Sequence, residues 1–123
     1  MISFDDFNMN GDVPIYLQIL LHIKRGIVAG SVCNGDELPS RRVLSALLGV
    51  NPNTIHKAYR MLEDEQLVSS RPGAKSYMLL DEVKTEQVRE QLLKSDTLNV
   101  VTAMKQMGIT KAEALSLIEK YWE

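Results

Sequence analysis

Hydrophobic residues recur at helical spacing in the first part of the chain. Ile15, Ile19, Ile23 and Ile27 stand four positions apart, which places them on one face of an amphipathic helix. Pro14 suits the first position of this helix, because the first turn leaves its amides unbonded and proline has none. The preceding segment, to about residue 13, carries two phenylalanines among polar residues. We expect it to be an irregular arm that packs its aromatic rings.

A short helical pattern follows a predicted turn and a very short strand. Ser40 is a good N-cap, because its hydroxyl can accept a hydrogen bond from an unpaired amide of the first turn. Leu44, Leu47 and Leu48 form the apolar side of this helix, and Gly49 ends it.

A second short helix begins at once and has two distinct faces. Asn51 can cap it, and Pro52 fits its first turn. The predicted buried stripe has the spacing i, i+3, i+4, i+7 and consists of Ile55, Ala58, Tyr59 and Leu62. The opposite, polar stripe has the same spacing and consists of Asn53, His56, Lys57 and Arg60. We therefore predict a helix of about 12 residues with an exposed basic face, and two short helices joined by a glycine-containing turn make a helix-turn-helix.

Two strand-like segments, residues 67–70 and 76–80, come next. The segment between them contains a Pro-Gly pair and two cations: Arg71, Pro72, Gly73 and Lys75. This pattern predicts a β-hairpin with a basic tip. A hairpin after a helix-turn-helix is a wing, so the predicted fold class is α+β, mostly α, with a winged helix-turn-helix domain over residues 1–80.

Residues 81–123 have helical periodicity. One long helix or two shorter ones can span about residues 83–107, and the pattern leaves both open. Gly108 is a stop signal, and Thr110 begins a capping box with Glu113. The following helix places four apolar residues on one face: Leu115, Ile118, Tyr121 and Trp122. Since this region has too little core to stand alone, we expect it to be a helical dimerisation region that pairs with a second copy of the chain.

Composition narrows the class of protein. The chain has 123 residues, is 45% hydrophobic and has a net charge of -2. Its charge is uneven, because six basic and only three acidic residues lie between positions 38 and 80, and such a local excess suits phosphate binding. No apolar run approaches a membrane span, and the N-terminus does not resemble a signal peptide. With a single cysteine, these features favour a cytoplasmic protein.

The polar side of the second short helix suits the major groove, whose base edges carry a distinguishable pattern of donors and acceptors. Side chains in its first turns can bond to bases or phosphates, and cations further along can neutralise phosphates. The preceding helix and the wing contribute further cations. The DNA contacts that follow from these positions are Arg41, Arg42, Asn53, Thr54, His56, Lys57, Arg60, Arg71 and Lys75.

Other chemistry finds little support. His22 is interpreted as a hydrogen-bonded structural side chain, and Cys33 as a loop thiol in preference to a redox sensor. The two histidines and the cysteine lack metal-ligand spacing, and no catalytic constellation or cofactor motif appears. The alternatives to a DNA-binding regulator are a winged helix that docks proteins, which needs an exposed apolar stripe on the second short helix, and, more remotely, an enzyme.

Two long motifs resemble one known family. Residues 35–45, Gly-Asp-Glu-Leu-Pro-Ser-Arg-Arg-Val-Leu-Ser, are similar to the G-D-x-L-P-S-x-R-x-L-A signature of GntR-family regulators. Residues 48–63 follow, and their Gly-Val-Asn-Pro-Asn-Thr and Lys-Ala-Tyr runs resemble the YtrA subfamily. The opening Pro-Ile-Tyr-Leu-Gln-Ile of residues 14–19 is similar as well. The resemblance covers about residues 13–80.

The resemblance implies particular contacts. The family's DNA-contacting arginine falls on Arg42, and its recognition-helix contacts fall on Asn51, Pro52, Asn53, Thr54 and His56. The family wing begins at Gly73, but Lys75 replaces its second glycine. Gln66 likewise replaces a glycine after the recognition helix.

The resemblance also implies how such a protein acts. A short helical tail in this subfamily serves dimerisation instead of forming a large effector domain. We therefore expect a homodimer that binds a near-palindromic operator in double-stranded DNA and represses by occlusion, with a transporter operon as the implied target. A groove between the DNA-binding domain and the dimer helices is left open as the place for an unknown small-molecule effector.

Overall fold

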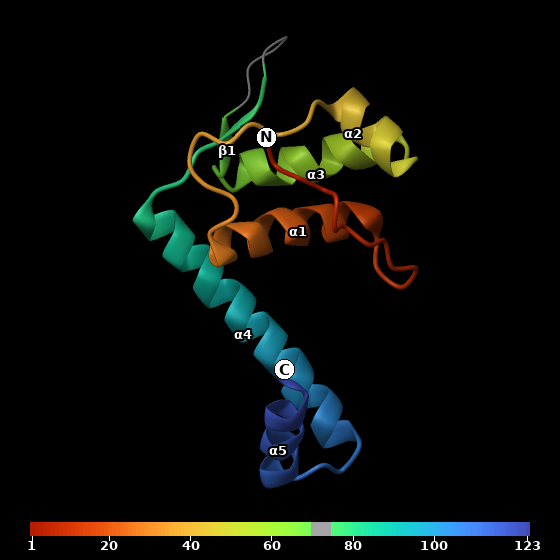
Figure 1. The fold of residues 1–123 in the computed structure, drawn as a ribbon, viewed down its shortest axis with the longest axis vertical. Helices are drawn as coiled ribbons and strands as arrows, with labels where there is room; N and C mark the ends of the chain where they lie inside the picture. The colour runs from red at the N-terminus through yellow and green to blue at the C-terminus, as the bar shows by residue number, and fades with distance from the viewer. Residues whose placement is uncertain (70–74) are drawn as a thin grey trace. The chain divides into compact units, whose positions relative to one another are not determined.

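The structure is a computed structural model that describes residues 1–69 and 75–123 (Figure 1). Its elements in chain order are α1 (Ile15–Ala29), α2 (Arg41–Leu48), α3 (Pro52–Asp64), β1 (Val68–Ser69), β2 (Tyr77–Met78), α4 (Glu82–Gln106) and α5 (Lys111–Tyr121). The fold class is as predicted. By their internal packing the residues form two compact units, Met1–Arg89 and Glu90–Glu123, which are described separately. Among the described residues, no helix is long and apolar enough to cross a membrane.

Helix α3 is at the centre of the first unit, packed against α1, α2 and β1 (Figure 1). Its predicted inner stripe is confirmed, since these four side chains are at most 1% exposed: Ile55, Ala58, Tyr59 and Leu62. The facing side of α1 buries Ile19, Ile23 and Ile27, also as predicted. Burying aliphatic side chains of this size stabilises a fold by about 1.5–3 kcal/mol each, so this contact holds α3 in place.

The predicted helix ends are largely confirmed. The Ser40 hydroxyl accepts a hydrogen bond from the Val43 amide at 3.1 Å, and Gly49 ends α2 in the left-handed conformation. The Asn51 side chain caps α3. Pro14, however, is the N-cap of α1 and not its first helical residue, a difference of one position.

Helix α2 differs from its prediction in one apolar position. Leu44 is fully buried, but Leu47 is 63% exposed. Ser45 is buried instead, and its hydroxyl donates to the Val50 carbonyl at 2.5 Å. A helix of eight residues presents only a narrow face to the core. Here that face contains Leu44, Ser45 and the half-buried Leu48.

The hairpin is shorter than predicted. Strand β1 pairs antiparallel with β2, in the register Val68 opposite Met78 and Ser69 opposite Tyr77. The expected very short strand before α2 is a single bridge between Glu37 and Tyr77. The predicted hairpin tip, residues 70–74, lies outside the described residues.

The N-terminal arm packs its rings as predicted. Phe4 is buried, and its ring lies 4.5 Å from that of His22 and 5.5 Å from that of Phe7, measured between centroids. The Nε2 atom of His22 lies 2.9 Å from the Ser3 carbonyl oxygen. His22 is therefore a hydrogen-bonded structural side chain, as expected.

One long helix, α4, resolves the choice between one helix and two. Its start belongs to the first unit: the Lys84 ammonium donates to the carbonyl of Gln66 at 2.7 Å and to that of Leu79 at 3.3 Å. Val88 is buried. These contacts fix the first turns of α4 to the end of α3 and to the wing.

The second unit contains the rest of α4, a turn and α5. Gly108 occupies the turn with a φ of 72°, and the Thr110 hydroxyl accepts a hydrogen bond from the Glu113 amide at 3.2 Å, which is the hydroxyl half of the predicted capping box. None of residues 90–123, all of which the structure describes, is buried. The unit therefore has no closed core of its own.

Candidate nucleic-acid interface

The outer face of α3 is polar and basic. Asn53, His56, Lys57 and Arg60 are exposed, and Thr54 is half-buried. They lie opposite the buried stripe, as the periodicity predicted. The exposed stripe carries no large apolar side chain. A winged helix that docks proteins would need an exposed apolar stripe here, and α3 does not have one.

The start of α3 carries no negative charge that would repel an anion. Its first turn contains no acidic residue, and the N-terminus of a helix carries a partial positive charge. The Asn51 side-chain oxygen accepts a hydrogen bond from the Asn53 amide at 2.8 Å, which leaves the NH₂ group of Asn51 to face outward partners. Pro52 occupies the first helical turn, as predicted. Such an end suits a phosphate.

Lys57 is held by a residue that the sequence did not single out. Its ammonium lies 3.9 Å from the centroid of the Tyr16 ring on α1. A cation over an aromatic face is attracted by the ring electrons, so Tyr16 restrains Lys57 while leaving it exposed. No local pattern connects positions 16 and 57, because the contact depends on how α1 packs on α3.

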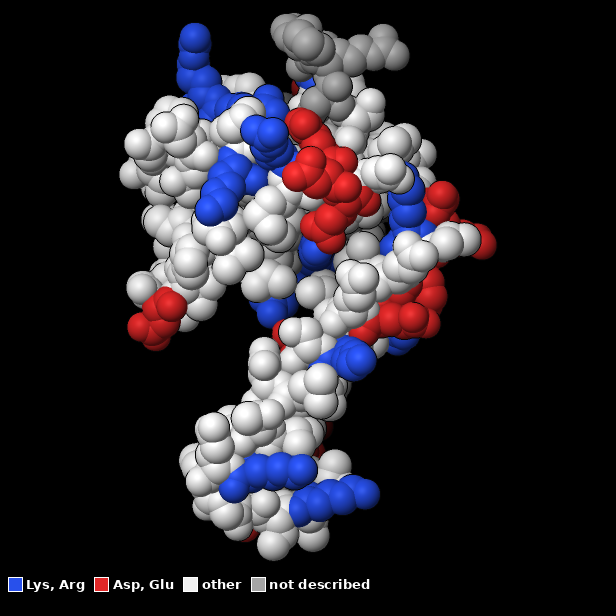
Figure 2. Space-filling model, turned by 180° about the vertical axis from the view of Figure 1, so that it is seen from behind, with Lys and Arg blue, Asp and Glu red and all other residues white. Residues whose placement is uncertain are grey.

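Acidic side chains near the end of α3 are paired with basic ones. Glu65 accepts from the Lys24 ammonium at 2.7 Å, and Glu63 from the Arg41 guanidinium at 3.1 Å. By contrast, Arg42 and Arg60 form no ion pair within the described residues and are exposed. The space-filling view shows Lys and Arg side chains gathered beside an acidic group in the part that holds α2 and α3 (Figure 2). The pairing leaves unpaired positive charge on one surface.

Arg41 and Arg42 occupy different environments although both were predicted to contact DNA. Arg42 is exposed. The Arg41 guanidinium packs over the Tyr59 ring, 5.4 Å from its centroid. Tyr59 itself donates its hydroxyl to the Pro39 carbonyl at 2.6 Å. Burial raises the pKa of Tyr59 far above its usual range, and the positive charge of Arg41 only partly opposes this shift. Tyr59 is thus a neutral core residue, as expected.

The wing is described only at its base. The Lys75 ammonium lies 3.3 Å from a carboxylate oxygen of Glu37, and its side chain is 70% exposed. Arg71 and Gly73, the other predicted wing contacts, lie outside the described residues. Among those that are described, no cluster of His, Cys, Asp or Glu could hold a metal ion.

A helix-turn-helix followed by an antiparallel hairpin, with a polar and basic outer helix face, defines the class of winged helix-turn-helix regulators that bind DNA. Comparison with known proteins agrees. The model of the family described as "Bacterial regulatory proteins, gntR family" matches residues 15–77. The chain belongs to this GntR family, whose members are transcriptional regulators and not enzymes.

Individual relatives narrow the assignment of the chain within the GntR family. The chain is 34% identical over 123 residues to the uncharacterized HTH-type transcriptional regulator YhcF of Bacillus subtilis, covering 96% of this chain and 98% of that protein. It is 38% identical over 98 residues to the HTH-type transcriptional repressor YtrA of the same organism, covering 75% and 73%. The structure of a GntR family transcriptional regulator from Listeria monocytogenes superposes with a TM-score of 0.79 at 34% identity, covering 91% and 98%. The chain is a YtrA-like GntR regulator.

Proposed function

We propose that the chain is a repressor that binds a specific operator with the outer face of α3. The observation that carries this proposal is the division of α3 into a fully buried apolar stripe and an exposed stripe of Asn53, His56, Lys57 and Arg60. The first turns of a recognition helix reach base edges, and cations further along reach phosphates. Thr54 and His56 therefore read bases together with Asn53, while Lys57 and Arg60 neutralise phosphates.

Other contacts surround this helix. Arg42 at the start of α2 lies on the exposed surface and meets the DNA backbone. Asn51 presents its amide group at the start of α3, and Lys75 brings a cation at the base of the wing, with Arg71 and Gly73 as the contacts proposed for its tip. Residues 1–80 form the DNA-binding domain in this proposal.

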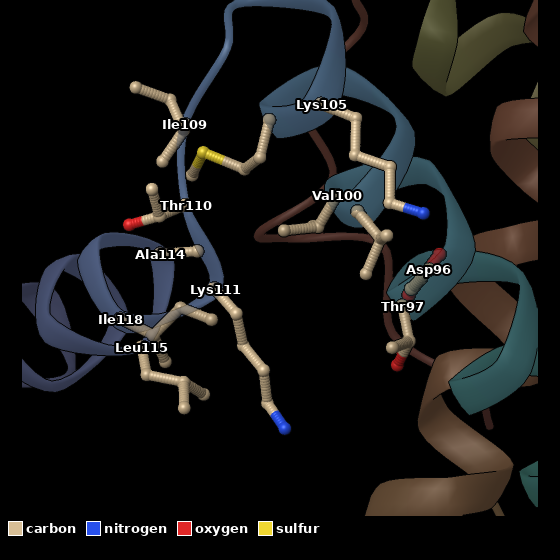
Figure 3. A pocket seen from close by; sticks show the side chains of 12 residues that line it. Asp96, Thr97, Val100, Lys105, Ile109, Thr110, Lys111, Ala114, Leu115 and Ile118 are labelled. Carbon is tan, nitrogen blue, oxygen red and sulfur yellow. The ribbon is translucent and has the colours of Figure 1, made fainter.

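The apolar surface of the second unit supports the proposal of a dimer. The proposed dimerisation region is residues 81–123, which includes this unit and the start of α4. Its apolar side chains line a groove of about 530 Å³ between the later part of α4 and α5. Val100, Ile109, Leu115 and Ile118 are among the residues that line this groove (Figure 3). Units below about 40 residues seldom fold without disulfides, metals or oligomerisation. The chain has one cysteine, and a second copy of the same unit offers a matching apolar face.

A dimer fixes the form of the operator. Two recognition helices related by a two-fold axis enter successive major grooves about 10 bp apart on a near-palindromic site. A dimer bound there occludes polymerase, and the related YtrA of Bacillus subtilis is described as a repressor. We propose a transporter operon as the target, on the resemblance to the YtrA subfamily, and sequencing the genomic DNA captured by the protein tests this.

The DNA contacts are tested by selecting a duplex from a randomised pool with the unaltered protein, then measuring its affinity for variants by mobility shift. Loss of one good contact costs about 1–3 kcal/mol, so Arg42→Ala and His56→Ala weaken binding at least about fivefold. Arg89→Ala, which removes an exposed arginine of α4, is the matched control and leaves affinity unchanged. Full binding by the Arg42 and His56 variants would contradict the assignment.

Sedimentation equilibrium tests the dimer. Ile118→Asp places a charge in the apolar groove, whereas Ser116→Asp adds the same charge to an exposed position of α5 outside the groove lining. At micromolar concentration the unaltered chain and Ser116→Asp sediment as dimers and Ile118→Asp as a monomer. A monomeric unaltered chain rejects the proposal.

A further inference from the structure

Arg41 is fastened to α3 by two contacts. Its Nη2 atom donates to Oε1 of Glu63 at 3.1 Å, and its guanidinium carbon lies 5.4 Å from the centroid of the Tyr59 ring. The Nε atom is buried without a hydrogen-bond partner, and 36% of the side chain is exposed. The guanidinium is therefore held against α3, with part of the side chain still open to solvent.

The same region of α3 also forms a hydrogen bond with Pro39, the residue before the Ser40 cap. Tyr59, one helical turn before Glu63, donates its hydroxyl to the Pro39 carbonyl at 2.6 Å. Pro39, with one contact to α3, and Arg41, with two, thus flank Ser40. Together the three contacts fix the position and direction of the first turn of α2, from which Arg42 projects.

A cation at this place needs compensation. Arg41 and Arg42 stand in the first turn of α2, where the partial positive charge of the helix end disfavours them. The Glu63 carboxylate compensates Arg41 within the unit. Within the described residues Arg42 has no such ion pair, so a phosphate outside the chain is the partner that its charge fits.

We propose that Arg41 is a positioning residue that acts through Glu63 and Tyr59, and that it aims Arg42 at a DNA phosphate without contacting DNA itself. This divides the role that the sequence assigned to both arginines. The inference rests on the proposed DNA contact of Arg42. The opposite arrangement, in which the Arg41–Glu63 pair opens on binding and both arginines meet phosphates, gives different results in the following measurements.

The first measurement is the salt dependence of binding to the selected duplex, for Arg41→Gln and its matched neighbour Arg42→Gln. Each cation-phosphate contact contributes about 0.9 to the slope of log affinity against log salt concentration. Arg42→Gln reduces the slope by that amount. Arg41→Gln weakens binding about two- to fivefold at every salt concentration and leaves the slope unchanged. A reduced slope for Arg41→Gln overturns the inference.

The second measurement exchanges the charges. Arg41→Glu and Glu63→Arg each weaken binding when made alone, because each places like charges together. The double variant restores the ion pair, although not the contact of the guanidinium with the Tyr59 ring. It therefore regains most of the lost affinity and the salt slope of the unaltered chain, since a positioning ion pair works in either direction. If Arg41 met a phosphate, the double variant would bind no better than Arg41→Glu, and the inference would be wrong.

Thermal unfolding without DNA separates the two proposals. The single charge variants lower Tm by about 3 °C or more, and the double variant regains most of the loss. A double variant that regains neither stability nor affinity rejects the ion pair as a positioning device while leaving the DNA contacts intact. If instead Arg42→Gln leaves the salt slope unchanged, α2 does not meet phosphate, and both the Arg42 contact and the inference fail.

Discussion

The two units of the chain differ in how far they bury their hydrophobic side chains. In Met1–Arg89, α3 buries its apolar stripe completely and leaves polar side chains outside. In Glu90–Glu123, large apolar side chains stay exposed: Leu115 is 56% exposed, Ile118 42% and Trp122 81%. The first unit therefore holds its shape by internal burial, whereas the second leaves its apolar side chains open to the partner copy proposed above. The proposed DNA-reading surface and the proposed pairing surface thus differ in how they are built.

The largest effect is expected from removing core volume in the first unit. Leu62→Ala deletes a fully buried side chain of α3 and should lower the free energy of unfolding by about 2–5 kcal/mol, because a cavity remains. The matched change Leu115→Ala acts on an exposed leucine and should leave the first unit unaffected. Hydrogen exchange of the α3 amides measures the stability of the first unit in both variants. Equal losses would show that the two regions are one cooperative core.

A smaller effect is expected at a tyrosine hydroxyl. Tyr59→Phe leaves the buried Pro39 carbonyl without its hydrogen bond and should cost about 1–3 kcal/mol. Tyr121→Phe removes a hydroxyl from a side chain that is 72% exposed and should change stability by less than about 0.5 kcal/mol. Denaturant unfolding compares the two variants. A neutral Tyr59→Phe would mean that the hydrogen bond does not fasten α2 to α3.

Removing helix caps compares the same two units, with a smaller expected loss of stability. Ser40→Ala removes the cap of α2 and should cost about 1 kcal/mol of stability in the first unit. Thr110→Ala removes the equivalent hydroxyl from α5, and its cost should appear in dimer dissociation instead. Unfolding curves at several protein concentrations distinguish them, because only the loss at Thr110 depends on concentration.

The smallest effect concerns backbone strain. Gln66 has a φ of 60°, in the left-handed region that disfavours side chains with a β-carbon. Gln66→Gly should therefore stabilise the first unit by about 0.5–1 kcal/mol. Gln91→Gly, inside α4, should destabilise by about 1 kcal/mol. Opposite signs in thermal unfolding support the strain, and a destabilising Gln66→Gly contradicts it.

Patterns within one element were enough to predict the two faces of α3 and the capping residues. Ser40, Asn51 and Thr110 act within three residues of themselves, so their roles are visible in local sequence. The burial of Tyr59 follows from its place in the apolar stripe. Periodicity therefore predicted α3 and the polar surface that it presents.

Contacts between elements were not visible in the same way. Arg41 and Arg42 are identical neighbours, and the positions of Glu63 and Tyr59 across the α2–α3 contact distinguish them. The ring of Tyr16 under Lys57 depends on how α1 packs on α3. Leu47 belongs to an apolar pattern, but the short helix turns it outward. For Arg41 and Lys57 the deciding partner lies far away in sequence.

Hydroxyl-radical footprinting of the selected duplex tests most directly whether one region reads DNA while the other pairs two chains. The account predicts two protected tracts centred about 10 bp apart and related by a two-fold axis, both lost in Ile118→Asp at concentrations where the unaltered chain protects them. A single protected tract with the unaltered chain, or protection that Ile118→Asp leaves unchanged, would contradict it.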